Sequence, residues 1–149
     1  MLTFPDAQDL SDDVRRVFEE LDRRNDPNGQ RVASLYNPPL DVVETVSSIE
    51  VILDVPGVGV DALRVFFKSG VLVIVGEKVA SDACGANGSA FHLVERGFGR
   101  FARVIRLGTA LDVSRARATL TSGELRVSVP RLEERRGREI AVTIHEQPR

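Results

Sequence analysis

The sequence has few of the residues that build disulfides and metal centres. Its 149 residues include a single cysteine, Cys84, and two histidines, His92 and His145. One cysteine cannot form an internal disulfide, and with two histidines it cannot supply the four ligands of a structural zinc site. We therefore expect no metal and no metal-dependent cofactor.

Long apolar runs and an excess of one charge are missing as well. No run approaches the ~18 apolar residues of a membrane span, and the first residues lack the positive start and apolar core of a signal peptide. The chain carries 20 basic and 22 acidic residues, a net charge of −2, without the basic footprint of a nucleic-acid binder. We expect a cytoplasmic protein with neither a membrane span nor a nucleic-acid partner.

Two patterns that could carry chemistry lack the context that each needs. Gly57, Gly59 and Ala62 have the spacing of a dinucleotide-binding turn, but the next segment, "LRVFFKSG", is too short for the required crossover helix. Cys84 lies in a polar loop, "SDACGANGSA", where no base is positioned to activate a thiolate, and His92 is typical of an ordinary strand. The sequence predicts no catalytic site, no cofactor and no enzyme; a redox cross-link through Cys84 stays open.

Composition divides the chain into three regions. Residues 1–38 form an acidic N-terminal arm, residues 39–130 are rich in β-branched runs, and residues 131–149 form a C-terminal extension that begins with the charged stretch "RLEERRGRE". Interleaved Glu and Arg are typical of a solvated linker. We expect one folded domain with an arm at each end.

The arm contains one amphipathic helix. Val14, Val17, Phe18 and Leu21 recur at the spacing of a single helical face. Ser11 is the predicted N-cap, and the turn chemistry of "NDPNG" ends the helix. So narrow a stripe needs a surface to pack on. That surface is either its own domain or, as we favour, other subunits or a client protein.

The middle region is typical of an antiparallel β-sandwich. Its short runs include "SIEVILDV", "VLVIV", "FHLVE", "FARVIRL" and "LRVSV", separated by turn residues such as Pro-Gly and Ser-Gly. The run "VLVIV" is apolar on both faces and is predicted to lie centrally in a sheet. Pro130 is predicted to end the last core strand because it cannot donate to a sheet ladder. The fold class is therefore all-β.

Two further patterns point to contacts outside the domain. Near the C-terminus, "IAVTI" alternates apolar and smaller residues at the period of a strand with one apolar face. After "FHLVE" (residues 91–95), arginine recurs at Arg96, Arg100, Arg103 and Arg106. This basic run is either a solvated strand face or a set of ion-pairing partners for acids of another subunit.

Five stretches covering about two thirds of the chain resemble the α-crystallin domain of small heat-shock proteins of the bacterial type. They are "PPLDVVET", "LDVPGV" with "GVLVIVGEK", "FHLVERGFGRFARVIRLG", "ARATLTSGELRVSVPR" and "IAVTI", which resembles the family's C-terminal I-x-I motif. The chain departs from the family pattern at Gly108, Phe66, Ser122 and Glu124, none of which is a core position. The resemblance implies an immunoglobulin-like antiparallel sandwich with a short helical arm and an extended tail.

The resemblance also implies dimers that exchange a strand. The loop after the fifth family strand would carry that strand onto the edge of the partner's sheet. The dimer-interface residues implied are Phe91, His92, Leu93, Val94, Glu95, Arg96 and Arg103.

Dimers of this family assemble further through the tail, which docks in an apolar groove of a neighbouring dimer. The implied tail residues are Ile140, Val142 and Ile144, and the implied groove residues are Leu63, Val65, Phe67, Ala118 and Leu120. The arm residues that would bind clients are Phe4, Val14, Val17, Phe18 and Leu21.

The implied function is that of an ATP-independent holdase chaperone. It would bind partly unfolded proteins, limit their aggregation under stress, work from a dynamic oligomer of dimers and pass clients to ATP-dependent chaperones. The alternative is a monomeric or dimeric interaction module like the CS-domain co-chaperones, which share the sandwich but lack the exchange loop and the tail stripe.

Overall fold

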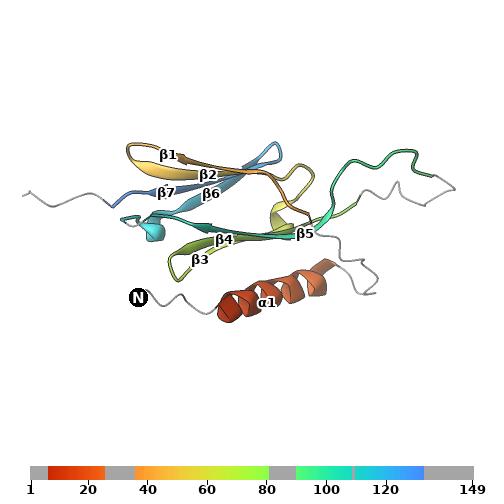
Figure 1. The fold of residues 1–149 in the computed structure, drawn as a ribbon, viewed down its shortest axis with the longest axis horizontal. Helices are drawn as coiled ribbons and strands as arrows, with labels where there is room; N and C mark the ends of the chain where they lie inside the picture. The colour runs from red at the N-terminus through yellow and green to blue at the C-terminus, as the bar shows by residue number, and fades with distance from the viewer. Residues whose placement is uncertain (1–6, 26–35, 81–89, 109, 133–149) are drawn as a thin grey trace, which may run out of the picture.

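The computed structural model describes residues 7–25, 36–80, 90–108 and 110–132. In these residues, two antiparallel β-sheets pack face to face, and one helix lies on the outer side of one of them (Figure 1). The all-β class and the helical arm predicted from the sequence are confirmed.

The first sheet has four strands in the order β1-β2-β7-β6. Its strands are β1 (Leu40–Glu44), β2 (Ser48–Asp54), β6 (Arg117–Thr121) and β7 (Glu124–Pro130). The pairing of β2 with β7 places Val51 opposite Val127 and Leu53 opposite Leu125, and all four side chains are buried. Strand β7 ends at Pro130, as predicted.

The second sheet has three strands in the order β3-β4-β5. These are β3 (Leu63–Lys68), β4 (Val71–Lys78) and β5 (Gly99–Arg106). All residues of the central strand β4 are buried. Leu72 and Ile74 belong to the core between the sheets, whereas Val71, Val73 and Val75 form a separate buried cluster on the opposite face. The central position predicted for "VLVIV" is therefore confirmed.

The helix α1 (Ala7–Asn25) covers the outer face of the three-stranded sheet (Figure 1). It ends at Asn25, where the turn chemistry predicted its end. The predicted N-cap at Ser11 is wrong, because the helix begins four residues earlier and Ser11 lies inside it. Three of the four preceding residues, Ala7, Gln8 and Leu10, are good helix formers, so the helix continues past the capping side chain of Ser11 toward the N-terminus.

The turn after β2 packs tightly against the hairpin that joins β6 to β7. Gly57 follows Pro56 with a φ of +80°, a conformation that favours glycine. Gly123 has a φ of +81°, and a Cβ at that position would lie 2.8 Å from the Cα of Pro56. The amide of Val55 donates to the carbonyl of Gly123 at 2.7 Å. These contacts close one end of the sandwich.

The chain that leaves β7 is anchored at the opposite end. The amide of Leu132 donates to the carbonyl of Ala110 at 2.8 Å, and the amide of Arg131 donates to the carbonyl of Ser47 at 2.8 Å. The guanidinium of Arg131 also forms an ion pair with Glu44. The first two residues of the extension are thus part of the folded domain.

The strand predicted for "FHLVE" is not present in the single chain. Residues 90–98 are described but belong to neither sheet, and they stand away from the sandwich (Figure 1). The prediction was wrong for one chain because a strand needs a pairing edge, which the sequence pattern does not supply.

Candidate functional site

The predicted groove residues lie along two edge strands of opposite sheets. On β3, Leu63 is buried, and Val65 and Phe67 are half-buried against the core between the sheets. On β6, Leu120 packs against the same core, whereas Ala118 is exposed. The structure therefore brings four of the five side chains to one apolar cluster and leaves Ala118 outside it.

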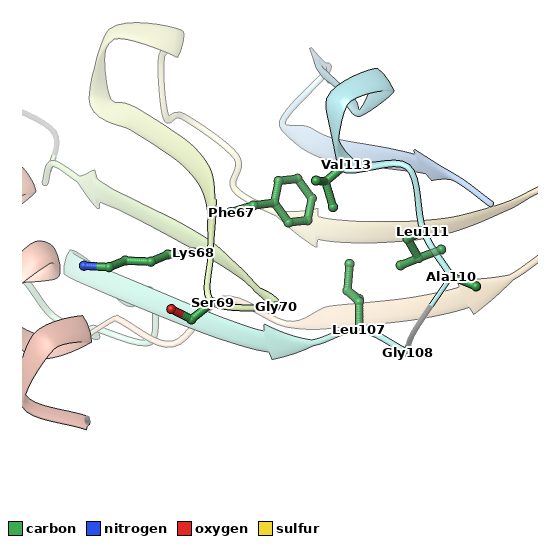
Figure 2. A pocket seen from close by; sticks show the side chains of 9 residues that line it. All are labelled: Phe67, Lys68, Ser69, Gly70, Leu107, Gly108, Ala110, Leu111 and Val113. Atoms are coloured by element: carbon green, nitrogen blue, oxygen red, sulfur yellow. The ribbon is translucent and has the colours of Figure 1, made fainter. Parts of the chain in front are cut away.

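A surface hollow of about 410 Å³ continues from the end of β3. We call it the end hollow. It is lined by residues 67–70 on one side and by Leu107, Gly108, Ala110, Leu111 and Val113 on the other. Figure 2 shows the ring of Phe67 pointing toward Val113, with Leu107 and Leu111 beside them. The end hollow is thus a mainly apolar recess between β3 and the connection from β5 to β6.

Sequence reasoning placed Phe67 near a docking surface but missed the other apolar side chains of the end hollow. Leu107, Leu111 and Val113 lie in the connection between two strands, where no period of two or 3.6 marks a face. Gly108, noted as a departure from the family pattern, lines the same recess. A signal was available only in the clustering of aliphatic residues just after β5.

The segment predicted to cross to a partner is exposed in the single chain. Phe91, Leu93 and Val94 have exposed fractions of 59%, 74% and 61%. His92, Glu95 and Arg96 are exposed as well. Three large apolar side chains in four exposed residues are an unusual arrangement for a segment that stays in water.

Strand β1 forms the outer edge of the four-stranded sheet. Its outer side has no strand partner among the described residues. Val42 and Val43 on this strand are exposed, and Val46 in the following turn is 99% exposed. An edge strand of this kind presents free backbone groups to which another strand can pair.

Arg103, the predicted interface arginine, is engaged within its own chain. Its guanidinium donates to Oδ1 of Asn37 at 2.9 Å and to the carbonyl oxygen of Pro38 at 2.8 Å. The amide of Tyr36 donates to the carbonyl of Arg100 at 3.0 Å, and the Tyr36 ring meets Phe101 edge to face at 5.8 Å. Arg103 therefore ties β5 to the segment before β1 and closes that side of the sandwich.

Lys78 contacts the base of residues 90–98, which we call the exchange segment, a role that sequence reasoning missed. Its ammonium is buried and lies 4.9 Å from the centre of the Tyr36 ring and 5.8 Å from that of Phe98. The guanidinium of Arg96 lies 5.1 Å from the Phe98 ring. Cation–π contacts thus fix the point at which the exposed segment leads into β5.

The predicted client-binding side chains of the arm lie on their own domain. Val14, Val17 and Phe18 are half-buried against Val71, Val73, Val75 and Phe66. The stripe therefore packs on its own sheet, the alternative that we did not favour. The side chain of Leu21 lies outside the described residues, as does Phe4.

The predicted tail residues Ile140, Val142 and Ile144 also lie outside the described residues. Among the residues that the structure describes, no three histidine, cysteine or carboxylate side chains gather as a metal site would require. Nor is any helix in those ranges both long and apolar enough to cross a bilayer.

Comparison with known proteins identifies the family. The Hsp20/alpha crystallin family profile matches residues 41–145. The chain belongs to the Hsp20/alpha crystallin family. It is similar to the 16.6 kDa heat shock protein of Oryza sativa subsp. japonica, with 35% identity over 77% of this chain and 78% of that protein. It also resembles heat shock protein 16 of Schizosaccharomyces pombe, with 30% identity over 80% of this chain and 84% of that protein.

Solved structures of small heat-shock proteins share this fold. The protein from Xylella fastidiosa, described as having a distinct high order structure, matches with a TM-score of 0.63 and 25% identity over 73% of this chain and 98% of that chain. Heat shock protein 16.0 from Schizosaccharomyces pombe matches with a TM-score of 0.62 and 29% identity over 72% of this chain and 99% of that chain. The resemblance to the α-crystallin domain is therefore confirmed, and the family is one of chaperones rather than enzymes.

Proposed function

We propose that this chain is an ATP-independent holdase that binds partly unfolded proteins and limits their aggregation under stress. The observation that carries the proposal is the apolar surface that one copy of this chain leaves exposed, at residues 91–94 and at the end hollow. Exposed apolar patches of this kind are typical of protein–protein contact sites. Captured clients would pass to ATP-dependent chaperones for refolding.

Two copies would first form a dimer by exchanging the exposed segment. Residues 91–96 of one copy would pair with the free edge of β1 in the other, and the second copy would return the same contact. Strand addition to an open edge satisfies backbone groups and buries alternate side chains. Phe91 and Leu93, which share one face of such a strand, would then be covered, as would Val42 at the receiving edge.

Dimers would assemble further through the tail. Ile140, Val142 and Ile144 would dock along the β3 edge and into the end hollow of a neighbouring dimer, where Phe67 already presents an apolar face. Burying three aliphatic side chains is worth roughly 1.5–3 kcal/mol each before costs. Ordering the tail removes much of this gain, so each contact is weak.

Weak contacts repeated around a closed assembly explain how the oligomer can be both stable and dynamic. Each tail is held close to its groove by the rest of the assembly, so its effective concentration is high. One tail can dissociate while the others hold. Heating would then shift the population toward dimers and open grooves, which are the species that capture clients.

The function is tested by aggregation of a thermolabile enzyme in the absence of ATP. Light scattering of the heated enzyme should fall as purified chain is added, and should be nearly abolished at a subunit ratio near one to one. Added ATP should make no difference. An inert protein at the same mass concentration serves as the control. Undiminished scattering at a severalfold excess of the chain would overturn the proposal.

The dimer is tested by one apolar-to-acid substitution and a matched control. Leu93→Asp places a charge in the proposed interface, and we expect native mass spectrometry to show monomers. Val60→Asp makes the same change at a residue outside the proposed interface that is 70% exposed, close to the 74% of Leu93. This variant should keep the wild-type mass. If the wild-type chain itself is a lone protomer at every concentration, the CS-domain-like interaction module becomes the better function.

A further inference from the structure

The outer face of the three-stranded sheet is an apolar patch with a basic rim. Strand pairing places Phe66, Val73 and Val104 in one row across the sheet, with Val71 and Val75 on either side of Val73. The same face carries the basic residues Arg64, Lys68, Arg100 and Arg106 around this patch. Glu77 lies opposite Arg100 at one end and is buried. We call this surface the outer sheet face.

Helix α1 complements the outer sheet face in both shape and charge. Val14, Val17 and Phe18 cover the valines of β4, as described above. Beside this stripe, Asp13 forms an ion pair with Lys68, and the guanidinium of Arg100 lies 5.4 Å from the Phe18 ring. The helix thus supplies an apolar stripe with the acidic Asp13 beside it to a surface that presents apolar residues flanked by base.

The helix covers this surface only in part. Val104 keeps an exposed fraction of 49%, although it lies in the same row as the buried Val73. The contacting side chains of α1 are half-buried rather than buried. Partial burial of a few side chains gives a modest docking free energy, so α1 can be displaced by a ligand that fills more of the face.

We infer that the outer sheet face is a capture surface for amphipathic helical segments with acidic residues beside an apolar stripe, and that α1 is a built-in competitor for it. Such segments become exposed when helical proteins begin to unfold. The inference rests on the proposed holdase function and adds to it the location and chemistry of one client site. Helix α1 is the template for the partner, because it is the segment that occupies the surface.

The inference is tested with a fluorescently labelled peptide of residues 7–25 added to the full-length protein. Binding is measured by fluorescence anisotropy for the wild-type chain, Asp13→Lys and Asp12→Lys. Asp13→Lys removes the ion pair with Lys68 and so weakens the docking of the chain's own helix, whereas the labelled peptide still carries the Asp13 that can pair with Lys68. Asp12→Lys is the matched control, because Asp12 is exposed and faces Arg15 of the same helix at 3.7 Å.

We expect Asp13→Lys to bind the peptide about two- to fivefold more tightly than the wild-type chain, the effect expected when one partly exposed ion pair is lost. Asp12→Lys should bind as the wild-type chain does. Equal binding by all three proteins, or no saturable binding to Asp13→Lys, would overturn the inference.

A charge exchange separates a specific surface from a merely loosened helix. The protein Lys68→Glu also loses the ion pair with its own helix, so its outer sheet face opens. The Lys68→Glu protein should bind a peptide that carries Asp13→Lys more tightly than it binds the unaltered peptide. The Asp13→Lys protein, which keeps Lys68, should show the opposite preference and bind the unaltered peptide more tightly. An unchanged preference would show that the peptide binds elsewhere.

Aggregation assays on the same proteins separate this inference from the proposed function. Asp13→Lys should suppress aggregation at a severalfold lower ratio of chaperone to client than the wild-type chain, and Asp12→Lys at the wild-type ratio. If the wild-type chain suppresses aggregation but the peptide does not distinguish the variants, the capture surface is wrong and the holdase function stands. If the peptide binds as expected but neither the wild-type chain nor any variant suppresses aggregation, the holdase function is wrong and the surface serves only to bind the chain's own helix α1.

Discussion

Replacing Arg103 with alanine separates its role inside the chain from a role at an interface. The Arg103 guanidinium donates two hydrogen bonds, one to the side chain of Asn37 and one to the carbonyl of Pro38. Asn37 is exposed, so its amide oxygen can bond to water in the variant. Pro38 is fully buried, and the substitution would leave its carbonyl without a charged donor.

The magnitude follows from these two different surroundings. A hydrogen bond from a charged donor contributes about 1.5–3 kcal/mol, and a buried carbonyl left without a partner costs about 1–3 kcal/mol. The two figures describe overlapping effects, and the bond to Asn37 adds little. We therefore expect Arg103→Ala to lower the free energy of unfolding by about 2–4 kcal/mol. Arg103→Lys can reach one of the two acceptors and should lose about half as much.

The assay is urea unfolding followed by circular dichroism at one fixed protein concentration, because assembly changes the apparent stability. Hydrogen exchange at the amide of Tyr36, which donates to Arg100, reports on whether the segment before β1 loosens. Arg126→Ala is the matched control. Its exposed ion pair with Glu124 should contribute less than about 1 kcal/mol.

A different pattern would refute this reasoning. If Arg103→Ala keeps the wild-type unfolding midpoint and Tyr36 stays protected while the native mass falls to that of a monomer, Arg103 acts at the interface alone. The intramolecular hydrogen bonds would then contribute nothing measurable to the fold.

Two further predictions concern the core and the tail. A Cβ at Gly76 would lie 2.5 Å from the ring of Phe101, so Gly76→Ala should lower the free energy of unfolding by about 1–3 kcal/mol in urea titrations. The control is Gly59→Ala: a Cβ there has nothing within 4 Å and φ is an ordinary −84°, so the free energy of unfolding should stay unchanged or rise slightly. Equal unfolding midpoints for the two variants would contradict this account of the packing. Replacing Ile140 and Ile144 together with alanine should leave dimers in light scattering; intact large assemblies would show that the tail does not hold the oligomer.

The parts of the fold that sequence predicts well are those in which local pattern and tertiary burial agree. The alternation in β7 and the unbroken apolar run of β4 each state how many faces are buried, and the structure shows those faces covered. Pro130 ends β7 for a reason that is local to its own backbone. Such elements need no knowledge of what lies across the core.

The parts that sequence did not predict depend on a surface elsewhere. The apolar stripe that includes Val14 and Phe18 indicates that one face of the helix is buried. It does not indicate whether the surface that buries this face belongs to the same chain or to another. The run from Phe91 to Val94 has strand composition, yet a strand forms only beside a free edge. Leu111, in the end hollow, lies in a connection whose path is set by the two sheets and by no repeat of its own.

The anchoring of Arg131 and Leu132 has a consequence for the architecture of any larger particle. Because both amides are bonded to the domain, Leu132 is a fixed origin for the rest of the sequence rather than a frayed strand end. Ile140 lies about eight residues beyond that origin, and a fully stretched chain covers at most ~3.3–3.6 Å per residue, or roughly 26–29 Å. If Ile140 docks on a neighbouring subunit as proposed, that radius is an upper bound on the distance from Leu132 to the groove that receives it, so only closely spaced subunits can be joined in this way.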